Sequence, residues 1–97
     1  MEMKFDSKEL GLLAFNANEN FRNFLAKFYL EVEDVAKMGK TGYRVEFKTG
    51  QEKEQFYPII FEMLKINGFD IEDDDFTNHS YIEFTWINGI ARVASKA

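Results

Sequence analysis

Apolar residues recur three and four positions apart along the first third of the chain. This spacing places side chains on a single face of an α-helix. It predicts a long N-terminal helix over residues 7–38, with one apolar stripe facing the core. The stripe consists of Leu10, Leu13, Ala14, Ala17, Phe21, Phe24, Leu25, Phe28, Val32 and Val35.

The asparagine-rich stretch NANEN, residues 16–20, lies in the middle of this helix. Asparagine disfavours helix interiors and favours helix caps, whereas the unbroken apolar register favours continuity. A kink or break near Asn16–Asn18 is therefore an open alternative. Asp6 or Ser7 is suited to cap the start of the helix, and Gly39 or Gly42 to end it.

A strand and a second helix are expected next. In residues 43–48 apolar and charged side chains alternate, which is typical of a half-buried strand. Thr49 and Glu52 have the spacing of a capping box, followed by a helix to Asn67-Gly68. Pro58 either kinks a helix that begins near Gly50, or lies in the first turn of one that begins near Phe56.

The pattern in the last third of the chain predicts strands. Residues 69–72 resemble a short strand and residues 80–87 a stronger one, and Asn88-Gly89 favours a type I′ hairpin turn to a strand over residues 90–95. The order α-β-α-β-β-β predicts an α+β fold in a single small domain, residues 1–97. We expect a small mixed sheet with strands 43–48 and 69–72 parallel, the long N-terminal helix, and a second helix packed on the sheet.

Charge is distributed unevenly over these elements. The chain has 17 acidic and 12 basic residues, and no Lys or Arg lies between Lys65 and Arg92. Six acids fall in that gap, which leaves 11 acids against 12 bases elsewhere. The negative excess therefore comes from the C-terminal third, where it repels nucleic-acid phosphates and favours a basic partner.

Chemistry-bearing motifs are weak. Absence of cysteine excludes disulfides and thiolate zinc sites. The acidic run DIEDDDFTNHS fits no frame of a calcium-binding loop, and Gly39-Lys40-Thr41 lacks the earlier glycine of a phosphate-binding loop. His79, the only histidine, has no nucleophile at a productive spacing. We expect no enzymatic activity, no cofactor and no metal.

The N-terminal residues have no apolar core of a secretory signal, and no apolar run is long enough to cross a membrane. Together with the absence of cysteine, this predicts a cytoplasmic protein without membrane association.

These observations favour a non-enzymatic protein-binding module that covers a basic surface of a protein partner. Acidic inhibitors, immunity proteins and phage counter-defence proteins that imitate nucleic acid act in this way. Acidic side chains would steer the encounter, and neighbouring aromatics would hold the complex. The candidate residues are Asp70, Glu72, Asp73, Asp74, Asp75, Phe76, Tyr81 and Glu83.

Two alternatives stay open. The chain has 11 Phe and 4 Tyr, more aromatic surface than a core of this size readily buries, so a homodimer or assembly subunit is possible. Its contact surface would be the long helix, through Leu12, Phe15, Tyr29 and Leu30. A small nucleic-acid-binding domain, with Tyr43 and Phe47 stacking on bases, is less favoured because of the negative charge.

Overall fold

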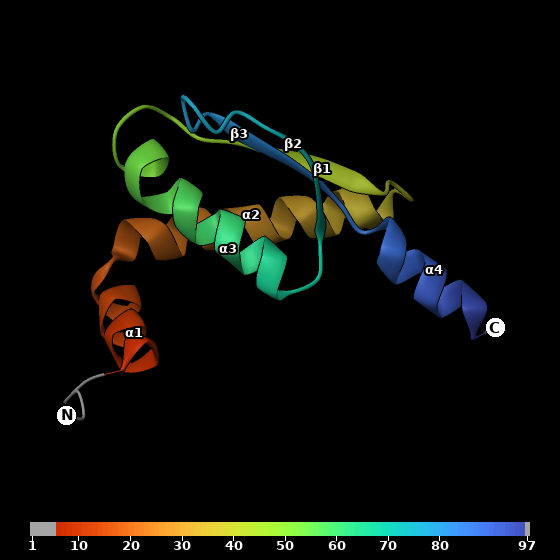
Figure 1. The fold of residues 1–97 in the computed structure, drawn as a ribbon, viewed down its shortest axis with the longest axis horizontal. Coiled ribbons are helices and arrows are strands. Elements are labelled where there is room, and N and C mark those ends of the chain that lie inside the picture. Colours follow the sequence, from red (N-terminus) through yellow and green to blue (C-terminus); the bar gives the residue numbers. More distant parts are fainter. Residues whose placement is uncertain (1–5, 97) are drawn as a thin grey trace. The chain divides into compact units, whose positions relative to one another are not determined.

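The structure, a computed structural model, describes residues 6–96 (Figure 1). The chain divides into two compact units, one up to Glu31 and one from Val32 onward, with the boundary inside one continuous helix. The elements are α1 (Ser7–Ala17), α2 (Glu19–Lys37), β1 (Gly42–Glu46), η1 (Glu52–Phe56), α3 (Tyr57–Ile66), β2 (Asp70–Asp74), β3 (Tyr81–Thr85) and α4 (Ile87–Ser95). The α+β class is confirmed.

The long N-terminal helix is broken at Asn18. A break near Asn16–Asn18 was one of the two alternatives that the sequence left open. Asn18 leaves helical geometry at φ −102° and ψ 85°, and its side-chain oxygen accepts the Phe21 N–H at 2.9 Å. Arg22 of α2 stabilises the break, because its guanidinium donates to the Phe15 carbonyl at 2.9 Å and to the Asn16 carbonyl, both at the end of α1. The cap therefore outweighs the continuous apolar register.

The apolar stripe is only partly buried. Phe21 and Phe28 are buried, whereas Leu10, Leu13, Ala14 and Ala17 in α1 are all exposed. α1 has no buried residue. The expectation of one stripe facing the core is therefore wrong for α1.

α2 ends as expected at Gly39, which has φ +83°. The Lys40 N–H donates to the Val35 carbonyl and the Gly39 N–H to the Ala36 carbonyl, the pattern of a Schellman motif. Glycine is suited to this left-handed position because it has no Cβ.

Pro58 lies in the first turn of α3, as the second of the two alternatives predicted. It is preceded by the π-helical turn η1, in which the Tyr57 N–H donates to the Glu52 carbonyl. Proline has no N–H and its ring clashes with the carbonyl four residues back, so a wider turn accommodates it. The expected capping box is shifted, because Glu52 accepts from the Lys48 N–H at 2.9 Å.

The sheet in the described residues has three strands in the order β1-β3-β2, and both pairings are antiparallel. β1 and β2 run in the same direction, but they are not neighbours, so the expected mixed sheet with direct parallel pairing is wrong. β3 takes the central position because its alternate residues Ile82 and Phe84 are completely or almost completely buried. A central strand is paired on both edges and covered by neighbours.

α3 packs against one face of this sheet and contacts β2 and β3 (Figure 1). The Phe47 and Tyr57 rings meet edge to face at 5.3 Å between centroids, and Phe69 meets Phe84 at 5.4 Å. The buried apolar residues from Val32 onward are Val45, Phe47, Phe56, Tyr57, Ile60, Leu64, Ile82 and Phe84.

The predicted hairpin at Asn88-Gly89 is wrong. Both residues lie in the first turn of α4, where the Asn88 side chain donates to the Gly68 carbonyl at 2.6 Å. The Thr85 hydroxyl accepts the Ile87 N–H at 3.2 Å and helps to start the helix. Ile87, Ile90, Ala91 and Ala94 have helical spacing, but α4 has no buried residue, so the contacts of Thr85 and Asn88 are what the structure shows at the start of the helix.

Among residues 6–96, none of the helices combines the length and apolar character that crossing a bilayer requires.

Candidate functional site

The acidic run forms a strand. Four of its carboxylates, Asp70, Glu72, Asp73 and Asp74, belong to β2, which lies at one edge of the sheet. The sequence had indicated a strand that ends at residue 72 followed by an acidic connection, so the strand extends further than expected. The actual connection to β3 spans residues 75–80.

Glu72 is the extra residue of a β-bulge. Ile71 pairs with Phe84 and Asp73 pairs with Glu83, so Glu72 has no residue of its own opposite it in β3. In a strand without a bulge, side chains alternate strictly, and Asp73 would share a face with Ile71. The bulge moves Asp73 to the face of Glu83, which we call the outer face, and turns Asp74 toward α3.

Asp74 serves the fold on the α3 side. Its carboxylate accepts the Tyr57 hydroxyl at 2.9 Å, and Tyr57 is only 2% exposed. Burial, together with this hydrogen bond, raises the pKa of the Tyr57 hydroxyl well above its usual range. The contact fixes β2 against α3 and gives Asp74 a structural role.

Asp75 organises the connection between β2 and β3. Its carboxylate accepts the Ser80 hydroxyl at 2.6 Å, the Asn78 N–H at 3.1 Å and the Asn78 side-chain amide at 3.4 Å. The hydrogen bond from Ser80, followed by the one from the Asn78 backbone, lowers the pKa of Asp75. Asp75 is therefore a turn residue and has little capacity left for a partner.

Phe76 and His79 belong to an aromatic cluster around Tyr57. The His79 ring stacks on Tyr57 at 4.7 Å between centroids, and Phe76 meets His79 edge to face at 5.5 Å. His79 adopts a positive φ of 52° in this turn. Phe76 nevertheless stays 66% exposed, so of this cluster it offers the most surface to a partner.

The outer face carries a connected polar network. Arg44 of β1 pairs with Glu83 of β3 at 2.8 Å, and its guanidinium lies 4.3 Å from the centre of the Tyr81 ring. The Tyr81 hydroxyl in turn donates to Asp73 at 3.0 Å, which raises the pKa of Tyr81. Glu83 raises the pKa of Arg44 in the same way. Arg44 was missed as a site residue because strand alternation gives only its face, and not its partner.

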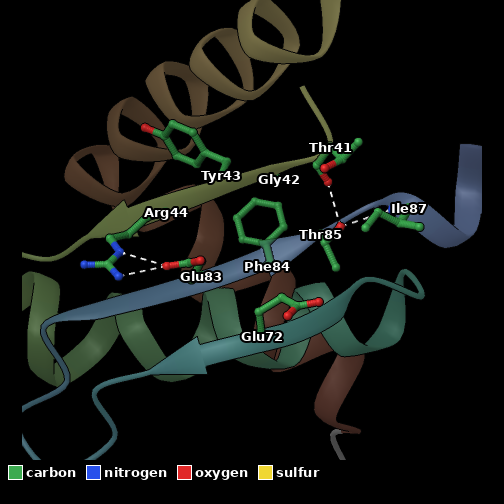
Figure 2. A pocket seen from close by; sticks show the side chains of 9 residues that line it. All are labelled: Thr41, Gly42, Tyr43, Arg44, Glu72, Glu83, Phe84, Thr85 and Ile87. Carbon is green, nitrogen blue, oxygen red and sulfur yellow. Dashed lines mark hydrogen bonds and ion pairs between the residues drawn. The ribbon is translucent and has the colours of Figure 1, made fainter. Parts of the chain in front are cut away.

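A shallow hollow of about 460 Å³ opens beside this network. Figure 2 shows Arg44 directed at Glu83 on neighbouring strands, with Glu72 projecting from β2 on the other side of β3. The hollow holds one cationic and two anionic side chains and therefore has a formal charge of −1. Its lining residues are Thr41, Gly42, Tyr43, Arg44, Glu72, Glu83, Phe84, Thr85 and Ile87.

Asp70 and Glu72 differ from the other acids of this region. Both are exposed, and neither side chain has a hydrogen-bond or ion-pair partner among residues 6–96. Of the eight predicted site residues, these two carboxylates are the ones fully available to a ligand. Asp73 and Glu83 lie near them on the outer face but are already engaged.

The four residues predicted for an oligomer surface lie on α1 and α2, and all of them are exposed. Phe15 is 38% exposed, and Leu12, Tyr29 and Leu30 are between 54% and 64% exposed. Leu12 and Phe15 belong to α1, Tyr29 and Leu30 to α2, so the break at Asn18 separates the two pairs.

The described part of the chain contains no group of three or more His, Cys, Asp or Glu side chains arranged to hold a metal ion. Comparison with protein-family models, with curated proteins and with solved structures finds no match to this chain.

Proposed function

We propose that the protein is a non-enzymatic binding module whose outer sheet face docks on a basic surface of a partner protein. The observation that carries this proposal is the pair of unpartnered carboxylates, Asp70 and Glu72, beside the engaged acids Asp73 and Glu83. The sequence has no Lys or Arg between Lys65 and Arg92 that could neutralise these two carboxylates. An inhibitor, immunity or counter-defence role is the corresponding biological class.

The hollow supplies a place for one basic side chain of the partner. A Lys or Arg that enters beside Glu72 would meet a carboxylate that has no partner within residues 6–96. Exposed charges of this kind accelerate association more than they strengthen the final complex, and their effect is screened by salt. Exposed Phe76, in the connection between β2 and β3, offers a separate apolar contact.

The test compares two charge-matched variants, Asp70→Asn/Glu72→Gln and Glu54→Gln/Glu62→Gln. All four residues are exposed acids without a side-chain partner in the described chain, and Glu54 and Glu62 lie in η1 and α3. Each immobilised protein is incubated with lysate of the native host and washed at increasing salt. We expect the wild type and the second variant to retain a basic protein that elutes at moderate salt, and the first variant to lose it.

The association rate of the recovered protein gives the quantitative readout. It should fall several-fold for Asp70→Asn/Glu72→Gln at low salt and converge with the wild-type rate at high salt. Equal capture by both variants, or a rate that does not respond to salt, would contradict the proposal.

A second candidate function is that of a subunit that assembles with copies of itself through α1 and α2. One observation favours it. α1 has no buried residue, and Leu12 and Leu30 are each more than 60% exposed. We expect Leu12→Gln/Leu30→Gln to dissociate such an oligomer without loss of helix content, measured by light scattering and circular dichroism. An oligomer that survives this double substitution rules this surface out.

A further inference from the structure

β1 is paired on one edge only. Within residues 6–96 it has β3 on one side and no strand on the other. The Phe47 N–H donates to the Ser80 carbonyl at 2.8 Å, and the Trp86 N–H donates to the Thr41 carbonyl at 2.9 Å. Alternate residues of a strand direct their backbone groups to the same side, so Tyr43 and Val45 also face β3.

The backbone groups of Gly42, Arg44 and Glu46 consequently point to the free edge. A regular edge of this kind is a template for another strand. The opposite edge of the sheet, β2, is protected by its bulge at Glu72 and by its row of carboxylates. β1 has no proline, no bulge and no lysine, and its two charged residues, Arg44 and Glu46, are opposite in sign.

We propose that β1 of a second copy of this chain adds antiparallel to the free edge of β1, giving a two-fold symmetric dimer with one continuous sheet. This inference stands on the geometry of β1 and is independent of the basic partner proposed above.

Charge selects the register of the two strands. Only residues 42, 44 and 46 can form the hydrogen-bonded pairs across this edge. Pairing Arg44 with Arg44, or Glu46 with Glu46, would place like charges directly opposite each other, which destabilises a sheet. Pairing Arg44 of one copy with Glu46 of the other gives two opposite-charge pairs, and the two-fold axis passes between the two Val45 residues.

The same register satisfies the side chains on both faces. Tyr43 of one copy comes opposite Phe47 of the other, and aromatic cross-strand pairs stabilise sheets. On the outer face, Glu46 is exposed and has no side-chain partner among the described residues, whereas Arg44 is already paired with Glu83. The dimer would place Arg44 between Glu83 of its own chain and Glu46 of the second copy.

The test uses complementary charge reversal, with purified protein studied by sedimentation over a range of concentrations. In Glu46→Arg both intermolecular pairs become Arg against Arg, and in Arg44→Glu both become Glu against Glu. We expect each variant to raise the dimer Kd roughly tenfold or more. An equimolar mixture of the two should form a heterodimer, because both of its pairs are again Arg against Glu.

Glu62→Arg is the matched control, since Glu62 is an exposed acid of α3 and this variant should dimerise like the wild type. Circular dichroism checks Arg44→Glu, which also loses the contact with Glu83. If that variant does not fold, two measurements still test the dimer. One compares the dimer Kd of Glu46→Arg with that of Glu62→Arg, and the other is hydrogen exchange of the wild type. The Arg44 and Glu46 amides should become protected as the wild-type concentration rises.

Two outcomes overturn the proposal. One is a wild-type chain that stays monomeric at roughly 1 mM, where even a weak dimer of about 4 kcal/mol is populated. The other is a dimer that Glu46→Arg leaves intact, in particular one that dissociates in Leu12→Gln/Leu30→Gln.

Discussion

Asp75 shows how a residue that looks available in the sequence is taken up by the fold. Its carboxylate accepts hydrogen bonds from Ser80 and Asn78 and so holds the connection between β2 and β3. Asp74 is occupied in the same way by Tyr57. Substitution of either residue would therefore disturb folding as well as binding, which makes Asp70 and Glu72 the appropriate positions for testing a partner.

The lowered pKa of Asp75 gives a prediction about acid stability. A carboxyl group whose pKa is lower in the folded chain stabilises the fold fully above its unfolded pKa, and this contribution is lost as pH falls through the folded value. The window therefore lies below about pH 4, the ordinary range of Asp. Asp75→Asn should be less stable than the wild type at pH 7, and the difference should shrink toward pH 2.

Urea unfolding of both proteins between pH 2 and pH 7 measures this difference. Asp34→Asn is a suitable control for the removal of one carboxylate, because Asp34 is exposed and belongs to another element, α2. A constant gap between wild type and Asp75→Asn across the whole range would mean that Asp75 does not titrate with folding.

The bulge in β2 places the carboxylates of the acidic run on two different faces of the sheet. One inserted residue, Glu72, sends Asp73 to the outer face and Asp74 to the α3 face. Neither the bulge nor its position follows from the sequence, because DIEDD has no glycine to mark it and little apolar alternation to set the register. This is the physical reason why the candidate site was predicted as an undivided cluster.

Deletion of Glu72 tests this role. Without Glu72 the two strands can pair residue for residue with Asp73 still opposite Glu83, so we expect the free energy of unfolding to change by less than about 1 kcal/mol. Deletion of Glu83 removes the same charge but shifts part of β3 by one residue. That shift turns either Ile82 or Phe84 out of the core, and the sheet should not form.

Chemical denaturation and circular dichroism of the two deletion variants measure the outcome. If deleting Glu72 is as damaging as deleting Glu83, the bulge is needed for the fold itself and is not an insertion that the sheet tolerates.

Most helices and strands could be predicted because their signals are local. Periodicity predicted the helical first third and β3, and glycine marked the end of α2. α4 was missed because Asn-Gly is a strong turn signal, although Ile87, Ile90, Ala91 and Ala94 carry helical spacing. Strand order could not be predicted, since it depends on which strand pairs along both of its edges, and no local pattern marks that strand.

At the scale of the whole molecule, charge follows the architecture closely. The acids of β2, β3 and the connection between them have no Lys or Arg close to them in the sequence, although Arg44 of β1 pairs with Glu83, whereas the sequence up to Lys65 is nearly neutral. The proposed dimer would combine both outer faces on the same side of one sheet, because its two-fold axis is perpendicular to the plane of the sheet. Two acidic faces in one assembly would increase the attraction for a basic partner and make it more sensitive to salt.

The single-domain prediction is untested at this scale. The chain has two compact units, and α2 passes from one to the other as a continuous helix. The unit from Val32 onward contains the sheet, α3 and α4, and therefore every residue of the proposed acidic site.

The strand order β1-β3-β2 also has a consequence for synthesis of the protein. Because β3 lies between two strands that both precede it in the chain, β1 and β2 have no pairing partner in this sheet while the polypeptide is emerging from the ribosome. Unpaired strand edges in a nascent chain are prone to association with other chains. The carboxylates of β2 would keep that strand hydrated during this interval, so the same charges proposed to attract a partner would also protect the newly made chain.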